Sequence, residues 1–264
     1  MFESFILGTI QGVAEWLPIS SEGMISLVRV NFFGDNNLED IIRIALFLHL
    51  GTFFSALIYF RKDVIKIIKD LFKYKVAKTE DKKLLNFLIV STIISGTIGF
   101  ILLKVILGLS ESSDFSGRLI TVIVGILLLL TAFLQLNKSA RETNKSIGDL
   151  KFIDGVLLGI AQGFAVLPGL SRSGVTVATL LLRNFDDIQA LRLSFLMSLP
   201  IVLGGNILLN MGTPIFSIEN LVGLIFAFIF GLLTIHFLLK LAKKINFGYF
   251  VLIFGVLVVL SVFI

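Results

Sequence analysis

Two stretches decide the fold: QGVAEWLPISSEG at residues 11–23 and QGFAVLPGLSRSG at residues 162–174. Each breaks an apolar run with a proline and a serine-rich turn. Neither flanking run reaches the roughly 20 apolar residues that cross a bilayer. At a shift of 151 residues the identical pairs include Gly8/Gly159, Gln11/Gln162, Gly12/Gly163, Ala14/Ala165, Ser20/Ser171 and Gly23/Gly174. The sequence therefore predicts two copies of a re-entrant helical hairpin, at about residues 2–33 and 152–182.

The composition is that of an integral membrane protein. Of the 264 residues, 56% are hydrophobic and 16% are charged, with a mean hydropathy of +0.99. A soluble domain is nearer 25% charged, so a water-soluble enzyme, a disordered chain and a nucleic-acid-binding module are excluded, and no nucleic-acid partner is expected. The chain has no cysteine, which excludes disulfides and thiolate chemistry. Its two histidines argue against a histidine-rich metal centre.

Between and after the hairpins lie six longer apolar segments, at about residues 44–60, 84–107, 119–136, 188–209, 218–239 and 247–264. We expect an all-α polytopic membrane protein with six transmembrane helices and two re-entrant hairpins. Residues 1–264 would form a single membrane domain. Repeat 1 covers about residues 1–136 and repeat 2 about residues 152–264, and the two have inverted topology.

The positive charges set the expected orientation. Residues 61–83 hold nine Lys and Arg and residues 138–151 hold four, whereas three other junctions share only Arg43 and Arg118. Cytoplasmic loops carry the excess of Lys and Arg, so the first hairpin enters from outside and the second from the cytoplasm. Apolar residues alternate with lysines along 61–83. This pattern predicts a cytoplasmic amphipathic helix on the inner leaflet, serving as a topology anchor.

The hairpin tips are the expected functional site. Irregular backbone cannot face lipid, and matched interruptions in two inverted halves indicate a site near the bilayer midplane. Three ionisable residues fall there, Glu15, Glu22 and Arg172, although each costs about 2.5–3.5 kcal/mol at membrane depth. We therefore expect the two tips to meet around these charges.

The other residues at the tips suit a phosphate. Hydroxyls and glycines gather there: Ser20, Ser21, Gly23, Gly169, Ser171, Ser173, Gly174 and Thr176. An arginine, hydroxyls and the free N–H groups of helix N-termini bind phosphate. A neighbouring carboxylate suits a metal that bridges the phosphate, or a general base.

These motifs resemble a known family. Residues 11–23 are similar to the first signature of the undecaprenyl-diphosphate phosphatase, or bacitracin-resistance protein, family, which reads E/Q-x-x-x-E followed by L-P-x-S-S-x-G-H. Residues 168–176 match the second, P-G-x-S-R-S-x-x-T, at every fixed position. The resemblance covers the whole chain, including its length, both hairpins and the repeat.

The resemblance implies hydrolysis of a polyprenyl diphosphate of the undecaprenyl type to the monophosphate and inorganic phosphate. This reaction recycles the lipid carrier of peptidoglycan and other cell-envelope glycan synthesis. It also implies Mg²⁺ or Ca²⁺ as cofactor, a location in the plasma membrane and an active site open to the outer face. The expected partners are the membrane and the polyprenyl diphosphate lipid, and a homodimer is compatible with the pattern.

We expect the catalytic residues to be Glu15, Ser21 and Arg172. Arg172 would hold the β-phosphate or form an ion pair with Glu15 or Glu22. Glu15 would be a metal ligand together with Gln11, or the base, and Ser21 would be the nucleophile or a helix cap. The substrate-binding residues would be Ser20, Gly23, Gly169, Ser171, Ser173, Gly174 and Thr176. Gln11 and its repeat mate Gln162 would bind metal or water, or tie the hairpins together.

One position departs from the family pattern. Met24 stands where the family has His, and a methionine can neither attack phosphorus nor carry a proton. The chemistry would then run through Ser21 with Glu15 or Glu22 as base, or the chain would retain a phosphate site as a carrier of prenyl phosphate or another anion, with weak or no hydrolysis. His49 would replace the missing histidine or serve only in helix packing.

Overall fold

The computed structural model describes residues 1–18, 20–34, 38–110, 145–167, 170–210, 217–241 and 247–260, with isolated positions between 126 and 136. The span expected at 119–136 and the candidate Gly169 therefore fall mostly or wholly outside the described residues. Within them the chain is helical, and the one bridge of β type joins Lys145 to Phe185.

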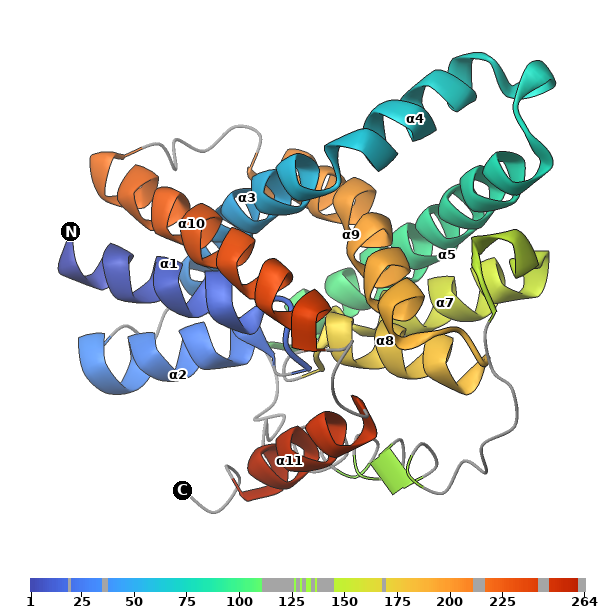
Figure 1. Ribbon diagram of the computed structural model, residues 1–264. Helices are drawn as coiled ribbons and strands as arrows, with labels where there is room; N and C mark the ends of the chain where they lie inside the picture. Colours follow the sequence, from blue (N-terminus) through green and yellow to red (C-terminus); the bar gives the residue numbers. More distant parts are fainter. Residues whose placement is uncertain are drawn as a thin grey trace.

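The helices follow one another as shown in Figure 1. They are α1 (Phe2–Ala14), α2 (Ser21–Phe33), α3 (Leu38–Tyr59), α4 (Arg61–Phe72), α5 (Thr79–Ser110), α7 (Phe152–Phe164), α8 (Arg172–Leu182), α9 (Asp187–Asn210), α10 (Ile218–Leu241) and α11 (Phe247–Leu260), with 3₁₀ turns at Tyr74–Val76 and Ile147–Asp149. Among the described helices α3, α5, α9 and α10 are long and apolar enough to cross a membrane. The chain is thus a membrane protein, as its composition predicts.

The two interrupted segments form two helical hairpins, α1 with α2 and α7 with α8. Their helices are 11–13 residues long, which corresponds to less than about 20 Å at 1.5 Å per residue. The second helix of each hairpin begins in the same way. Ser20 Oγ accepts the Gly23 N–H at 3.2 Å, and Ser171 Oγ accepts the Gly174 N–H at 3.2 Å. An N-cap serine therefore begins the second helix of each hairpin.

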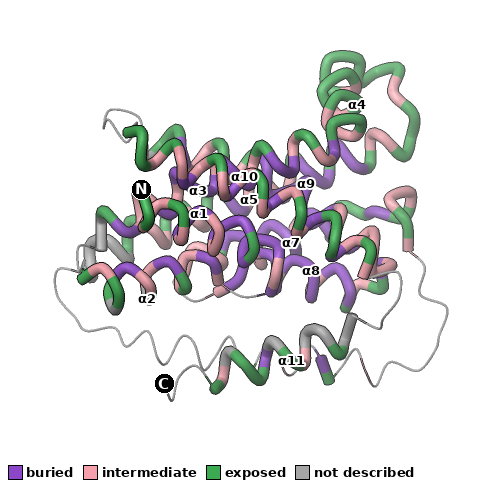
Figure 2. Tube along the Cα trace, turned by 60° about the vertical axis from the view of Figure 1, so that its left-hand side comes forward, coloured by how far each residue is buried: buried purple, intermediate pink, exposed green. Residues whose placement is uncertain are grey.

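The packing of the first half recurs in the second half. Helix α1 packs on α10 and α7 packs on α5, so each hairpin lies against a helix of the opposite half. Likewise α2 packs on α3 and α8 on α9, and α3 also contacts α9. Buried residues concentrate where the hairpins and α9 converge, at the centre of Figure 2. The hairpin tips therefore lie in the most enclosed part of the molecule.

Glycines allow each hairpin to approach its supporting helix closely. A Cβ atom on Gly12 of α1 would lie 2.8 Å from backbone atoms of α10, and one on Gly8 would overlap the backbone of α10. The repeat mates Gly159 and Gly163 of α7 would each place a Cβ atom 2.7 Å from an isoleucine Cβ of α5. Small residues at such contacts are typical of helix pairs in membranes.

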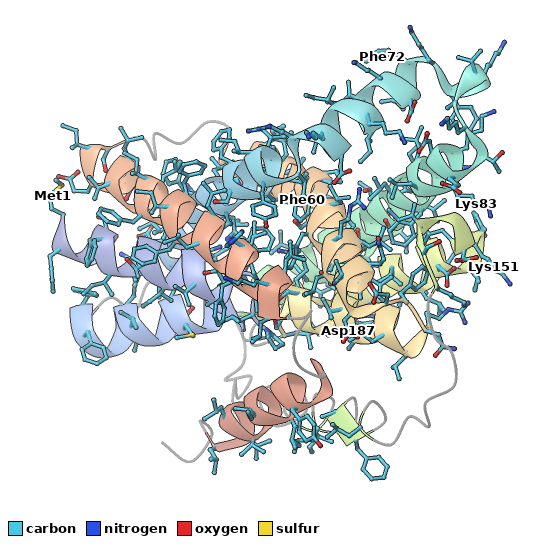
Figure 3. All side chains as sticks on the ribbon, viewed as in Figure 1. Met1, Phe60, Phe72, Lys83, Lys151 and Asp187 are labelled. Atoms are coloured by element: carbon cyan, nitrogen blue, oxygen red, sulfur yellow. The ribbon has the colours of Figure 1, made fainter. Side chains whose placement is uncertain are left out.

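Helix α4 corresponds to the first half of the basic stretch predicted at 61–83. None of its residues is buried, and it extends away from the bundle between the labelled Phe60 and Phe72 in Figure 3. The remainder forms a 3₁₀ turn and the start of α5, which begins at Thr79 rather than near residue 84. Glu80 and Asp81 lie in the first turn of α5, where acidic residues favour a helix N-terminus.

The close contact of α1 with α10 gives a stability prediction. Gly12→Ala should lower the free energy of unfolding by about 1–3 kcal/mol, because its new methyl group has no space against the α10 backbone. Gly205→Ala in α9 is the control, because nothing lies within 4 Å of the added atom. Denaturant unfolding of the purified protein in detergent measures both, and equal stability of the two variants would contradict the packing.

Candidate active site at the hairpin tips

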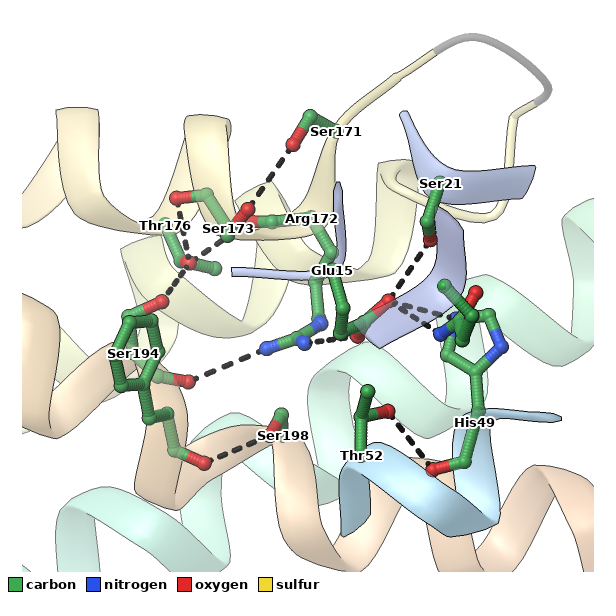
Figure 4. Close-up of polar contacts among 12 residues, drawn as sticks. Glu15, Ser21, His49, Thr52, Ser171, Arg172, Ser173, Thr176, Ser194 and Ser198 are labelled. Atoms are coloured by element: carbon green, nitrogen blue, oxygen red, sulfur yellow. Dashed lines mark hydrogen bonds and ion pairs between the residues drawn. The ribbon is translucent and has the colours of Figure 1, made fainter. Parts of the chain in front are cut away.

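Glu15 is the centre of the polar cluster shown in Figure 4. It follows the last residue of α1 and is 6% exposed. Its Oε1 forms an ion pair with Nη2 of Arg172 at the start of α8. Its Oε2 accepts hydrogen bonds from Ser21 Oγ and Gln11 Nε2, both at 2.9 Å, and lies 3.0 Å from His49 Nε2. One carboxylate thus joins both hairpins to α3.

His49 has an oxygen acceptor beside each of its ring nitrogens. Its Nδ1 lies 2.6 Å from the carbonyl oxygen of Ala45, and its Nε2 faces the Glu15 carboxylate. Both partners are acceptors, and a ring that carries a proton on each nitrogen, the imidazolium form, satisfies both contacts. Glu15 therefore lies between Arg172 and His49. With His49 in that form, the three groups carry a net positive charge, which favours an anionic ligand.

Three further contacts orient Arg172. Its Nη1 donates to the Ser194 carbonyl oxygen at 3.4 Å, and its guanidinium carbon lies 5.7 Å from the centre of the Trp16 ring. Thr176 Oγ1 donates to the Arg172 carbonyl oxygen at 2.8 Å and lies 2.7 Å from Ser194 Oγ. Both Ser194 and Thr176 have 0% exposure. The arginine is therefore held in place before any ligand arrives.

The serines of the second tip join it to the first. Ser173 Oγ donates to the Leu17 carbonyl oxygen at 2.6 Å, and Ser171 Oγ lies 3.2 Å from the same oxygen. Pro18 follows Leu17, and a proline disfavours helical geometry at the residue before it, so the helix does not continue and the Leu17 carbonyl has no intrahelical partner. The two tips thus meet, and the hydroxyls expected to bind phosphate hydrogen bond to backbone in this structure.

Four other residues singled out from the sequence have contacts or positions of a different kind. Gln162, the repeat mate of Gln11, donates to Ser95 Oγ at 3.1 Å and to the Met197 carbonyl oxygen at 3.4 Å, so the two glutamines have different partners. Ser20 and Gly23 form the α2 cap. Met24 is 38% exposed.

Two residues of the cluster were absent from the sequence prediction. Trp16 could have been found, because it follows Glu15 within the first motif. Ser194 belongs to no motif and carries no sequence signal.

The donor set suits a hard divalent cation that also binds phosphate. Among the described residues, no group of three or more His, Cys, Asp or Glu side chains is arranged so that it could hold a metal ion by itself. However, Gln11 Oε1 is buried without a hydrogen-bond partner in the described part of the chain, on the same amide that donates to Glu15. Mg²⁺ is commonly held by one or two carboxylates together with phosphate oxygens of the substrate. Glu15 and Gln11 fit that requirement.

The sequence is similar to known proteins along almost its whole length. A sequence model of the family described as Bacitracin resistance protein BacA matches residues 4–260. The chain is 45% identical over 265 residues to the undecaprenyl-diphosphatase of Methanococcoides burtonii, covering 99% of this chain and 98% of the relative. It is 36% identical to the undecaprenyl-diphosphatase of Haloarcula marismortui, covering 96% of this chain and 93% of the relative. It is 34% identical to that of Sulfurisphaera tokodaii, covering 93% of this chain and 91% of the relative.

The charge balance around Glu15 can be tested without substrate. Glu15→Gln leaves Arg172 and His49 as buried cations without their carboxylate, and removal of one member of a buried pair costs about 3–5 kcal/mol. The double variant Glu15→Gln with Arg172→Gln should cost clearly less than the sum of the single changes. A double-mutant cycle on unfolding in detergent measures the coupling, and strictly additive effects would contradict the ion pair.

Proposed function

Because the chain belongs to the bacitracin resistance protein BacA family, we propose that it hydrolyses undecaprenyl diphosphate to undecaprenyl phosphate and inorganic phosphate. The reaction returns the lipid carrier to cell-envelope glycan synthesis. The observation that carries the proposal is the buried Glu15–Arg172 ion pair between the two hairpin tips, with Ser21 bonded to the same carboxylate. It combines a cation for phosphate with a hydroxyl beside a base.

We propose six membrane spans and two re-entrant hairpins, with the first hairpin and the active site open to the outer face of the plasma membrane. The short hairpin helices and the recurrence of packing between the two halves support this topology. The basic segment 61–83 supports the orientation, since positive loops remain cytoplasmic. The apolar sequences at 119–136 and 247–264 are long enough to supply the two remaining spans.

The geometry supports a phosphoryl transfer through Ser21. Ser21 Oγ donates to Glu15 Oε2 at 2.9 Å, which is the arrangement of a nucleophile and its base. Ser21 Oγ attacks the β-phosphorus, Glu15 takes the hydroxyl proton, and the bond to the prenyl monophosphate oxygen breaks. Water then attacks the phosphoserine and releases inorganic phosphate. Arg172 binds the β-phosphate oxygens and offsets their charge, while His49 holds the carboxylate in place.

A divalent cation completes the proposed site. Glu15 and the unpartnered Gln11 Oε1 would hold it, and when bound it supplies charge neutralisation for the phosphate oxygens. These oxygen donors do not select between Mg²⁺ and Ca²⁺, because both ions bind carboxylate and amide oxygens.

Removal of Arg172 tests the hydrolase directly. Arg172→Ala should lower kcat by about two to three orders of magnitude, the loss expected when one charge-stabilising group is removed. Arg183→Ala is the matched control, because Arg183 pairs with Asp154 through a 2.7 Å bond outside the Glu15 cluster. Phosphate release from undecaprenyl diphosphate by protein in detergent is the measurement. Parent activity in Arg172→Ala would refute the role, and no release by the parent together with uptake of prenyl phosphate into vesicles would indicate the carrier.

The repeat offers a matched test of the cation site. Gln11→Ala should raise the concentration of Mg²⁺ or Ca²⁺ needed for half-maximal activity by about tenfold, the lower end of the loss expected for groups that support a metal site. Gln162→Ala, which changes the repeat mate, should leave that concentration unchanged. Activity is titrated with each cation after treatment with a chelator. An equal shift in both variants would count against Gln11 as a ligand.

A further inference from the structure

A concave surface lies at the corner between α3 and α4, outside the Glu15 cluster. A groove of about 470 Å³ is lined by Ile58, Tyr59, Phe60, Arg61, Lys62, Asp63 and Leu232. None of these residues contributes to the Glu15 cluster. One wall is apolar, from Ile58 of α3 and Leu232 of α10, and the other carries the charges at the start of α4. The groove therefore combines a hydrocarbon surface with a cationic end.

The positive charge of this groove is uncompensated. Asp63 is held by Arg192 of α9, whose Nε donates to Asp63 Oδ2 at 3.1 Å and whose Nη2 bonds to Oδ1. Within the described part of the chain no carboxylate forms an ion pair with Arg61 or Lys62, and both are exposed. The one acidic group of the groove is thus neutralised, and two cations remain for a ligand.

The surroundings of the groove fit a membrane surface. Val64 and Ile67 of α4 pack towards the core, whereas Ile65, Ile68 and Leu71 are each at least 50% exposed. Residues 61–83 contain nine of the 23 Lys and Arg but only four of the 18 Asp and Glu, so this segment accounts for the whole net charge of +5. A basic segment with exposed apolar side chains is attracted to anionic lipid.

We propose that this groove binds an anionic phospholipid from the leaflet that the basic segment faces. Arg61 and Lys62 contact the headgroup phosphate, and an acyl chain lies along Ile58 and Leu232. The apolar wall favours a lipid over free phosphate, and the two cations favour an anionic over a zwitterionic headgroup. The site is separate from the proposed hydrolase, and its test does not use activity.

The absence of cysteine from the chain makes a selective probe available. Ile58→Cys, at a position 45% exposed in the groove wall, is labelled with a fluorophore in the full-length protein in neutral detergent. Spin-labelled phosphatidylglycerol should quench it more strongly than spin-labelled phosphatidylcholine, and unlabelled dioctanoyl phosphatidylglycerol should reverse the quenching. Inorganic phosphate at the same concentration should not reverse it.

Two double variants with the same charge change locate the contact. Arg61→Gln with Lys62→Gln should weaken phosphatidylglycerol binding by about tenfold or more, because these two cations contact the headgroup directly. Lys73→Gln with Lys75→Gln, beyond the groove, should change it little. Circular dichroism confirms that both fold. Equal quenching by the two lipids, equal losses in the two variants, or competition by inorganic phosphate would each overturn the proposal.

Discussion

The ion pair between Glu15 and Arg172 is the interaction on which the rest of the structure depends. A buried carboxylate and a buried guanidinium are each costly alone, and their pairing requires the two hairpin tips to meet. The contact is reinforced where Ser171 and Ser173 reach the Leu17 carbonyl oxygen. If this pair were lost, a charged side chain and the Leu17 carbonyl group would be left without partners in the most enclosed part of the molecule.

The repeat builds a symmetric scaffold around an asymmetric site. Ser21 and Arg172 occupy equivalent positions of the two motifs, and both bond to the Glu15 carboxylate, one to Oε2 and the other to Oε1. The position equivalent to Glu15 is Val166, so the second half has no carboxylate of its own there. Similar capping and packing therefore bring two different side chains to one acid.

The sequence predicts much of this arrangement because its signals are local. A proline, an N-cap serine and a repeated glycine pattern suffice for the hairpins, and charges at membrane depth indicate where the tips meet. His49 could not be assigned from sequence, because one histidine in an apolar span gives no directional information. Ser194 could not be found either, because it belongs to no motif and only tertiary packing brings it to Thr176 and Arg172. The bonding of Ser171 and Ser173 to a carbonyl also depends on how the tips pack.

The meeting of the two hairpin tips can be measured in the membrane by disulfide formation. A Cβ atom on Gly174 would lie 3.3 Å from Cβ of Pro18, close to the roughly 3.5–4.5 Å of a disulfide. In this cysteine-free chain, Pro18→Cys with Gly174→Cys should form an intramolecular disulfide under mild oxidation and lose reactivity towards a maleimide. If both thiols remain separately reactive under conditions in which the single variants are fully labelled, the tips do not meet and the account fails.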